Sequence, residues 1–424
     1  MRKKYDVIVV GGGLTGVCAA IAAARQNQKV LLIEQEGALG GAAVNCLVTP
    51  FMPFHTKLNG DEEPTRLSQG IVLEILDRLA EIADDKYRKY CHAPCPSFNE
   101  EHLKVVLDRM CKKAKVTVLF HAMLCKSQVK EGRITSITVA CSGELLRFKA
   151  TTFIDATGDA DLAYMSGCPT QLGRESDNRC QPMTLCFRAI NVDTVNWDRD
   201  AIQKLYKEQQ AKGKIKNPRE NVLMFLVPHD NVVHFNSTRV IKHNPVDPLE
   251  LSKAEALARE QMLELFTLLK KNFVAFKDAT LFNSGISIGV RESRKIIGKH
   301  VLNVDEVKNC VKFEDRIAAG NYDIDIHSPD GSGTSHYYFP EGQYYTIPYR
   351  SLLPEKVNNL LVAGRCISST HEAQASYRIM PIVSTLGEAA GVAAGVANKA
   401  NVDVVDADYK VIQDELVKAG AFIG

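Results

Sequence analysis

A glycine-rich turn near the N-terminus constrains the fold more than any other feature of this sequence. Gly11-Gly12-Gly13-Leu14-Thr15-Gly16 follows an apolar, β-branched run at residues 5–10 and opens an alanine-rich segment that reaches residue 26. A second apolar run occupies residues 29–34. Short β-branched runs are typical of buried parallel strands, and alanine favours helix. The order strand, glycine turn, helix, strand therefore predicts a βαβ unit with a right-handed crossover.

The spacing of the three glycines predicts a dinucleotide site at this turn. In Gly11-x-Gly13-x-x-Gly16, the first glycine permits the tight turn, the second lets backbone N–H groups approach a diphosphate, and the third lets the helix pack closely on the sheet. Glu34 ends the next strand, where its carboxylate can accept hydrogen bonds from ribose hydroxyls and repel a 2′-phosphate. The neighbouring residues Leu14, Thr15 and Gln35 complete this part of the predicted site. The pattern alone leaves FAD and NAD as alternatives.

Three later segments favour FAD as the cofactor. Gly40-Gly41 can bring backbone close to the rest of an extended dinucleotide, Ala156-Thr157-Gly158 ends a later strand, and Gly364-Arg365 ends a strand close to the C-terminus. These residues are therefore further predicted cofactor contacts. No second Gly-x-Gly-x-x-Gly pattern follows a strand, which argues against a dedicated NAD(P)H domain.

A small-residue helix is predicted at residues 381–399. Gly387, Gly391 and Gly395 recur every four residues and share one face of this helix, although each costs about 1 kcal/mol relative to alanine. Close approach of this face to the glycine-turn helix or to the cofactor would offset that cost; a tight helix crossing without a cofactor is the alternative. Pro381 suits the first helical position and biases Met380 away from helix. The free N–H groups of the first turn would then face the N1–C2=O edge of a flavin and stabilise negative charge there.

The chain is predicted to be an α/β protein. Its parts are a Rossmann-like FAD-binding domain, with a central parallel sheet and a β-meander, and an inserted α+β substrate domain. The expected boundaries are 1–50, 99–166 and 355–424 for the discontinuous FAD-binding domain, 51–98 for a helical and irregular insertion, and 167–354 for the substrate domain. Helical spacing is expected at 67–84, 99–115 and 248–272, a strand at 116–120, and a strand that ends within the run 152–159. Alternating segments are expected at 127–139 and 145–149, and a strand-like run at 284–288.

Several motifs together resemble the bacterial FAD-dependent oxidoreductase family. They are VIVVGGGLTG with Glu34, the GG pair, IDATGDADLA, GVRESRKIIG, IPYRSLLP and LLVAGRCISSTHEAQASYRIMPIVSTLGEAAGVAAG. That family is related to the flavin domain of heterodisulfide reductase A and, more distantly, to fumarate reductase flavoproteins. The resemblance implies a glutathione-reductase-type FAD fold with the substrate domain over the flavin. It gives a cofactor role to Gly11, Gly13, Gly16, Glu34, Gly41, Gly158, Gly364, Arg378, Met380 and Pro381.

This sequence departs from both related groups. It lacks the cysteine-rich iron–sulfur motifs of heterodisulfide reductases, and His371 and Arg378 match only loosely the pattern near the last flavin motif of fumarate reductases. Fumarate is therefore poorly supported as a substrate.

Four side chains are the candidate catalytic groups. Arg378, three residues before Pro381, can pair with a substrate carboxylate or with flavin O2. His371, expected in the loop before the last helix, is a candidate general acid or base. Arg294 and Arg350, with Arg291, are candidates for an anion pocket. For each arginine the alternative is a structural ion pair.

Other residues carry weaker signals. The aromatic stretches at 336–339 and 344–345 are candidates for a roof over the substrate, with core packing as the alternative. Cys46 and Cys366 adjoin flavin motifs, but no two-cysteine redox spacing occurs.

Charge and cysteine usage exclude several classes of protein. The chain has 52 basic and 50 acidic residues and no long basic run, which argues against a nucleic-acid partner. Its 12 cysteines include no Cys-x-x-Cys, so neither a metal site nor a disulfide framework is expected, and reduced thiols indicate the cytoplasm. Apolar stretches fall short of the roughly 18 residues of a membrane span, so no membrane anchor is expected. A homo-oligomer is left open.

The leading functional hypothesis is an FAD-dependent oxidoreductase or dehydrogenase. It would transfer a hydride between flavin N5 and a small polar or anionic organic substrate, with an external electron donor or acceptor that the sequence does not identify. The alternatives are an electron-transfer flavoprotein that serves a protein partner and a tRNA-modifying flavoprotein.

Overall fold

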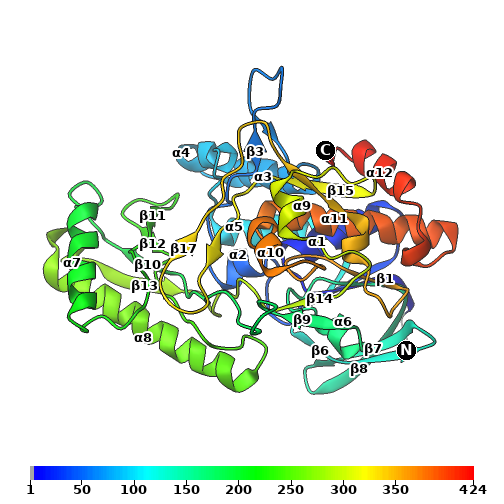
Figure 1. Cartoon of the computed structure of the whole chain (residues 1–424), viewed down its shortest axis with the longest axis horizontal. Helices are drawn as coiled ribbons and strands as arrows, with labels where there is room; N and C mark the ends of the chain where they lie inside the picture. The colour runs from blue at the N-terminus through cyan, green and yellow to red at the C-terminus, as the bar shows by residue number, and fades with distance from the viewer. Residues whose placement is uncertain (1–3) are drawn as a thin grey trace.

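The largest sheet of the protein has seven strands, of which β1, β6, β7 and β8 are labelled at the right of Figure 1. The computed structural model describes residues 4–424, so the first three residues of the predicted segment 1–50 lie outside the described residues. The strand order is β5-β2-β1-β8-β7-β6, with β19 paired to β8. The strands are β1 (Lys4–Val10), β2 (Val30–Ile33), β5 (Thr117–Leu119), β6 (Ala122–Lys130), β7 (Arg133–Cys141), β8 (Glu144–Asp155) and β19 (Leu360–Val362). The predicted α/β class with a central parallel sheet is confirmed.

The parallel strands end together, which creates the position of a site. Val10 is in register with Ile33 of β2 and with Asp155 of β8, and Asp155 is in register with Val362 of β19. The chain segments that follow these strands therefore gather at one edge of the sheet. A crevice at the carboxyl ends of parallel strands is where α/β folds bind ligands.

Strand β8 joins two kinds of sheet. Its first half pairs antiparallel with β7, and its second half pairs parallel with β1. The single alternating segment expected at 127–139 is wrong in one respect, because a turn at Glu131-Gly132 divides it between β6 and β7. Both turn residues have positive φ, 50° and 69°, which matches the twist of a two-residue hairpin. The predicted β-meander is therefore β6, β7 and β8.

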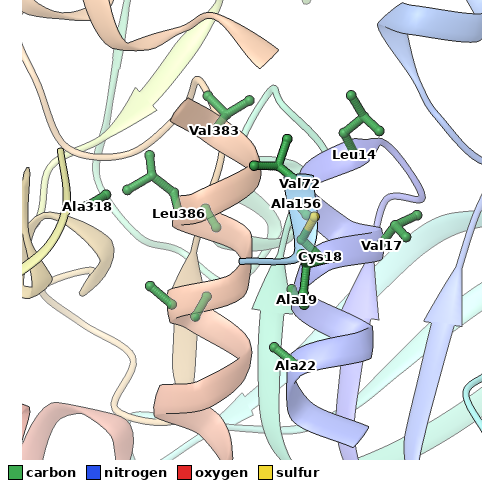
Figure 2. Packing of buried hydrophobic residues seen from close by; sticks show 14 of the residues in the cluster. Leu14, Val17, Cys18, Ala19, Ala22, Val72, Ala156, Ala318, Val383 and Leu386 are labelled. Carbon is green, nitrogen blue, oxygen red and sulfur yellow. The ribbon is translucent and has the colours of Figure 1, made fainter. Parts of the chain in front are cut away.

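Helices α1 (Leu14–Arg25) and α11 (Met380–Ala400) pack side by side in the same direction (Figure 2). A Cβ on Gly387 would lie 2.8 Å from the carbonyl carbon of Thr15, and one on Gly391 would lie 2.7 Å from Ala22 Cβ. The glycine stripe is thus used for close packing on α1. Helix α11 begins at Met380, one residue earlier than predicted, because Pro381 occupies its second position.

A second, four-stranded antiparallel sheet lies at the left of Figure 1, away from strands β6, β7 and β8 of the seven-stranded sheet. Its order is β11-β12-β10-β13, and residues of α7 and α8 complete its core. The predicted amphipathic helix is α8, with the expected bounds, whereas the strand-like run at 284–288 is wrong because β13 ends at Ser284. The elements here are β10 (Phe187–Ile190), α7 (Arg199–Ala211), β11 (Met224–Leu226), β12 (Val233–Phe235), α8 (Pro248–Asn272), η2 (Val274–Phe276) and β13 (Thr280–Ser284).

The largest hydrophobic core joins segments that the domain prediction separated. Side chains from residues 51–98 and 302–353, among them Ile75 and Tyr345, pack in the same cluster as α1 and α11. The proposed domain boundaries stay a prediction. The elements of the first segment and its flanks are α2 (Ala42–Asn45), β3 (His55–Thr56), β4 (Thr65–Arg66), α3 (Ile71–Ile82), α4 (Asp85–Arg88), η1 (Lys89–His92) and α5 (Glu100–Lys113).

The remaining elements surround the central sheet and the last helices. They are α6 (Asp161–Met165), β9 (Thr170–Leu172), β14 (Arg294–Ile296), α9 (Val304–Lys308), β15 (Arg316–Gly320), β16 (Ile326–His327), β17 (Thr334–Ser335), β18 (Tyr345–Pro348), η3 (Tyr349–Leu352), α10 (His371–Tyr377), η4 (Val404–Asp406) and α12 (Tyr409–Lys418). Asn99 caps α5 as expected, since its side chain accepts a hydrogen bond from the N–H of Glu101.

Helix α11 differs from expectation in its hydrophobicity. It has 21 residues and a mean hydropathy of 1.3 over its most apolar window, so by length and composition alone it could cross a membrane. The protein buries 94% of that window, which is the position of a core helix. All 12 cysteines are free thiols.

Candidate active site

A cavity of about 500 Å³ follows the carboxyl edge of the central sheet. Most of the predicted cofactor residues line it, namely Gly11, Gly13, Leu14, Thr15, Glu34, Gln35, Gly40, Gly41, Ala156, Thr157, Gly158, Gly364, Arg365 and Met380. Gly16 and Pro381 do not line it. Sequence reasoning missed one wall, which is formed by Leu251 and Glu255 of α8 and by residues of the loop after β13, such as Ser287 and Ile288.

Each glycine of the turn has a different role. Gly11 has φ of +100°, and a Cβ there would lie 2.7 Å from the carbonyl carbon of Ala156. Gly16 lies behind the turn, where a Cβ would meet the backbone of Gly11. Gly13 faces open space, because the nearest heavy atom to a Cβ there is Gly41 Cα at 3.8 Å. A ligand can therefore approach the backbone at Gly13.

The start of α1 suits an anionic ligand. Gly13 is the N-cap of α1 and has no side chain that could accept a hydrogen bond. The first backbone N–H groups of the helix are therefore free to donate to a ligand. These donors and the helix dipole favour negative charge, as in other diphosphate sites. The fit to a dinucleotide diphosphate thus comes from backbone geometry.

Glu34 closes one end of the cavity. Its Oε2 accepts a hydrogen bond from the Gly12 N–H at 2.5 Å, and its Oε1 accepts one from the Glu36 N–H at 2.8 Å. Burial raises the pKa of Glu34. The two backbone donors fix the carboxylate, and each oxygen keeps a further acceptor site for a ligand hydroxyl.

A buried carboxylate shapes the segment after β8. Asp155 is fully buried; its Oδ1 accepts from the Thr157 hydroxyl at 2.7 Å and its Oδ2 accepts from the Ala163 N–H at 2.9 Å. Burial raises its pKa. These bonds hold the loop that carries Gly158 and Asp159 along the cavity.

Arg365 supplies a positive charge to the wall of the cavity. Its Nη2 donates to Asp159 Oδ1 at 2.7 Å, and a Cβ on Gly158 would lie 2.9 Å from the guanidinium carbon. Glycine at 158, with φ of +82°, therefore leaves room for this side chain. A cation at this place is suited to a ligand with phosphate groups.

The N-terminus of α11 forms the other end of the cavity. Ile379 is the N-cap without a side-chain hydrogen bond, and Met380 and Val383 line the cavity. Arg378 also lines it, and its Nη2 lies 3.3 Å from Asp325 Oδ2. Arg378 Nε is enclosed and has no hydrogen-bond partner. An electron-rich ligand edge would find both free N–H donors and a guanidinium here.

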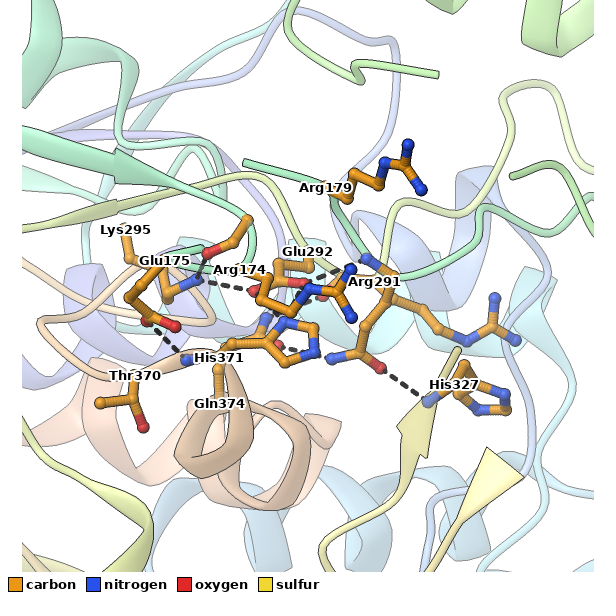
Figure 3. A network of polar contacts seen from close by, with 12 residues as sticks. Arg174, Glu175, Arg179, Arg291, Glu292, Lys295, His327, Thr370, His371 and Gln374 are labelled. Carbon is orange, nitrogen blue, oxygen red and sulfur yellow. Dashed lines mark hydrogen bonds and ion pairs between the residues drawn. The ribbon is translucent and has the colours of Figure 1, made fainter. Parts of the chain in front are cut away.

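His371 lies outside the cavity lining, in a buried network (Figure 3). It is the first residue of helix α10, which corrects its predicted position in a loop. Its Nδ1 lies 2.8 Å from Glu292 Oε2, and Lys295 Nζ donates to Glu292 Oε1 at 2.7 Å. Burial favours the protonated form of Glu292, but its hydrogen bond to His371 and the Lys295 charge outweigh burial and lower its pKa. This placement ties His371 to packing between segments far apart in sequence.

Arg294 and Arg350 also lie outside the cavity lining. Arg294 pairs with Asp161, which does line the cavity, and its guanidinium lies 4.3 Å from the ring centroid of Tyr164. Arg350 is half exposed and pairs with Asp315 at 2.9 Å. Both positions match the structural ion pairs that were the alternative to catalysis, so the function proposed below does not use them.

The other candidates divide in the same way. Cys46 lines the cavity with its Sγ 3.7 Å from Ser287 Oγ, and burial raises its pKa. Cys366 is buried outside the lining. Among the aromatic residues, Tyr345 is in the core and Tyr338 is exposed. Within residues 4–424 no group of three or more histidine, cysteine or acidic side chains has a metal-holding arrangement.

Comparison with known proteins identifies the cofactor. The family model described as FAD dependent oxidoreductase matches residues 6–416. The chain belongs to the FAD-dependent oxidoreductase family. FAD is therefore the cofactor of this flavoenzyme. The α1 turn, Glu34, Arg365 and the start of α11 line one cavity, and they stay the predicted residues that would hold it.

Curated relatives match only part of the FAD-dependent oxidoreductase. The tRNA uridine 5-carboxymethylaminomethyl modification enzyme MnmG of Streptococcus sanguinis is 27% identical over 187 residues, which are 39% of this chain and 27% of the relative. The MnmG of Aliarcobacter butzleri is 35% identical over 126 residues, 25% of this chain and 19% of the relative. The chain thus spans about a quarter of the length of these relatives.

Solved structures match along almost the whole chain at low identity. A geranylgeranyl bacteriochlorophyll reductase-like protein from Thermoplasma acidophilum is 14% identical, with 99% of this chain and 85% of that chain covered and a TM-score of 0.44. The p-nitrophenol 4-monooxygenase PnpA from Pseudomonas putida is 11% identical, with 98% and 84% covered and a TM-score of 0.46.

Proposed function

We propose that this enzyme transfers a hydride between flavin N5 and a small polar or anionic organic substrate. The observation that carries the proposal is the end of the cavity at α11, where uncapped backbone N–H groups and Arg378 occur together. Bound FAD supplies a site that accepts or donates a hydride. The chain itself must bind the cofactor, place the substrate and stabilise the charge that develops.

The residues have distinct tasks in this proposal. The α1 turn and Arg365 bind the diphosphate, and Glu34 accepts hydrogen bonds from the ribose. The α11 N-terminus stabilises negative charge on the N1–C2=O edge by about 0.3–2 kcal/mol. Arg378 holds either that edge or an anionic group of the substrate.

Anaerobic reduction of the bound flavin tests this function. The FAD-loaded protein is mixed with a panel of small hydroxy, amino and unsaturated acids and with their uncharged analogues, and flavin absorption is followed. Reduction or reoxidation by members of the acid panel, slowed by Arg378→Met, is the expected result. Redox change only with a protein partner present would replace the proposal by the electron-transfer alternative.

The partial matches to MnmG support a second candidate, a tRNA-modifying flavoenzyme. The near balance of 52 basic and 50 acidic residues opposes it. Salt-sensitive tRNA binding at micromolar concentration would favour this candidate. A cytoplasmic location and a homo-oligomeric state stay predictions.

A further inference from the structure

Two more arginines lie close to Arg378. Arg291 follows the loop that lines the cavity, and Arg219 comes from the segment between α7 and β11. Arg219 is only 4% exposed. Burial is the main cause that lowers the pKa of Arg291 to about 9, and the nearby charges of Arg378 and Arg219 lower it further.

Hydrogen bonds place the three segments together around His327. Asp325 contacts both His327 and Arg378, and Thr334 links His327 to Glu220, the residue after Arg219. The His327 N–H donates to Gln181, which precedes the Pro182 that accepts from Arg291.

These arginines lack the partners that buried cations usually have. Arg291 Nη1 donates to the Pro182 carbonyl at 2.7 Å and to Thr184 Oγ1 at 2.6 Å, both neutral acceptors. Arg219 Nε donates to a neutral asparagine oxygen, Asn221 Oδ1, at 3.3 Å. Within residues 4–424, neither arginine has a carboxylate at ion-pair distance.

The nearby carboxylates do not balance the charge. Asp325 serves Arg378 and also accepts from His327 Nε2 at 3.1 Å, and Glu220 pairs with the buried Arg239. Burial, with the charge of Arg291, lowers the pKa of His327 to about 3, so this imidazole stays neutral and adds no charge. Figure 3 shows His327 and Arg291 at the same edge of the network. A third carboxylate, Asp323, is engaged by His336. Arg219, Arg239, Arg291 and Arg378 therefore share Asp325 and Glu220 as their nearby carboxylates.

Buried charge without a counterion is costly, so the excess indicates a ligand that completes the site. We infer that Arg219, Arg291 and Arg378 bind the carboxylate of a small organic acid substrate. The inference rests on the proposed function, because only Arg378 of the three also lines the flavin cavity. A carboxylate matches the planar donor fork of guanidinium, and two such groups can hold it from different sides.

Ligand-dependent thermal stability of the FAD-loaded protein provides the test. Acetate, lactate, succinate and inorganic phosphate are titrated at constant ionic strength against potassium chloride, and the absorption band of the bound flavin is recorded. Saturable stabilisation by a carboxylate with a change in the flavin band is expected. Arg219→Gln and Arg291→Met should weaken the apparent affinity by roughly tenfold to a hundredfold, the loss of one charge-assisted contact. Arg291→Lys retains the charge and should bind with intermediate affinity.

Exposed Arg199, on α7 in the same part of the chain, provides the matched control, and Arg199→Met should leave the titration unchanged. Equal stabilisation by chloride, a preference for phosphate over every carboxylate, or unchanged binding in a folded Arg219→Gln protein would overturn the inference. The two proposals fail separately. A flavin reduced by an uncharged substrate without carboxylate binding supports the proposed function alone; carboxylate binding to a protein whose flavin no small molecule reduces supports the anion site alone.

Discussion

The glycine stripe of α11 predicts a graded effect of alanine substitutions on FAD affinity. Gly387 faces Thr15 at the cavity end of α1, Gly391 faces the middle of the helix, and Gly395 faces Gln26 at its far end. All three changes give the same gain in helix propensity, about 1 kcal/mol. They differ in how far from the cavity they push the helices apart.

The expected magnitude follows from the space at each position. A Cβ at Gly387 would lie 2.8 Å from the Thr15 carbonyl carbon and closer still to its oxygen. Carbon atoms pack at about 3.5–4 Å, so the backbones must separate by about 1 Å there. Overpacking of this kind costs about 1–3 kcal/mol, which exceeds the propensity gain. Because Thr15 lines the cavity, the displacement should weaken FAD binding by roughly tenfold.

Two measurements separate packing from cofactor binding. Urea unfolding of the apoprotein gives the loss of stability, and FAD titration followed by flavin fluorescence gives the affinity. We expect FAD affinity to fall most in Gly387→Ala, less in Gly391→Ala and least in Gly395→Ala, which serves as the matched control at the far end of the same face. A folded Gly387→Ala protein with wild-type FAD affinity would refute this account of the stripe.

Three further substitutions have expected outcomes. Burial raises the pKa of the Glu388 carboxyl to about 7, and its Oε2 accepts a hydrogen bond from the Ile71 N–H at 2.9 Å. As pH rises from about 4.5 to 7, the folded protein therefore keeps the carboxyl proton of Glu388, whereas the unfolded chain loses it. Stability should therefore fall by about 2–3 kcal/mol across this window in urea unfolding, and Glu388→Gln should flatten the profile; parallel profiles would contradict this. Glu34→Gln leaves one of two backbone donors without an acceptor and should weaken FAD binding roughly tenfold by fluorescence titration. Arg365→Met should weaken FAD binding by a similar factor by exposing the diphosphate to Asp159, and adding Asp159→Asn should restore part of it in the same titration.

Local patterns could be predicted because their physical causes are local. The βαβ unit, the capped helix at α5 and the glycine stripe each depend on residues close together in sequence, so periodicity and spacing identify them. The cofactor side of the cavity follows, since parallel strands end at one edge. His371 illustrates the limit: its partner Glu292 is 79 residues away, and no spacing rule connects the two.

One wall of the cavity and one of the three arginines were beyond prediction for a related reason. Ser287 and Ile288 line the cavity from an irregular segment whose sequence pattern predicts a strand. Arg219 belongs to no motif at all. What identifies Arg219 is the charge balance of its three-dimensional surroundings. A sequence signal did exist for Arg291, which lies in the GVRESRKIIG segment that carries the family resemblance.

The two helices that bury the glycine stripe also connect the two ends of the cofactor site. Leu14 and Thr15 lie in the first turn of α1, Met380 and Val383 lie in the first turn of α11, and both pairs line one cavity. Because the helices run in the same direction at backbone contact, their N-termini cannot move independently. In the proposed function, this rigid spacing would fix two parts of the cofactor relative to each other, and a misplacement of about 1 Å at the reacting atoms can cost a hundredfold in rate. The helix propensity lost at the three glycines is therefore the cost of fixing the distance between the N-termini of α1 and α11.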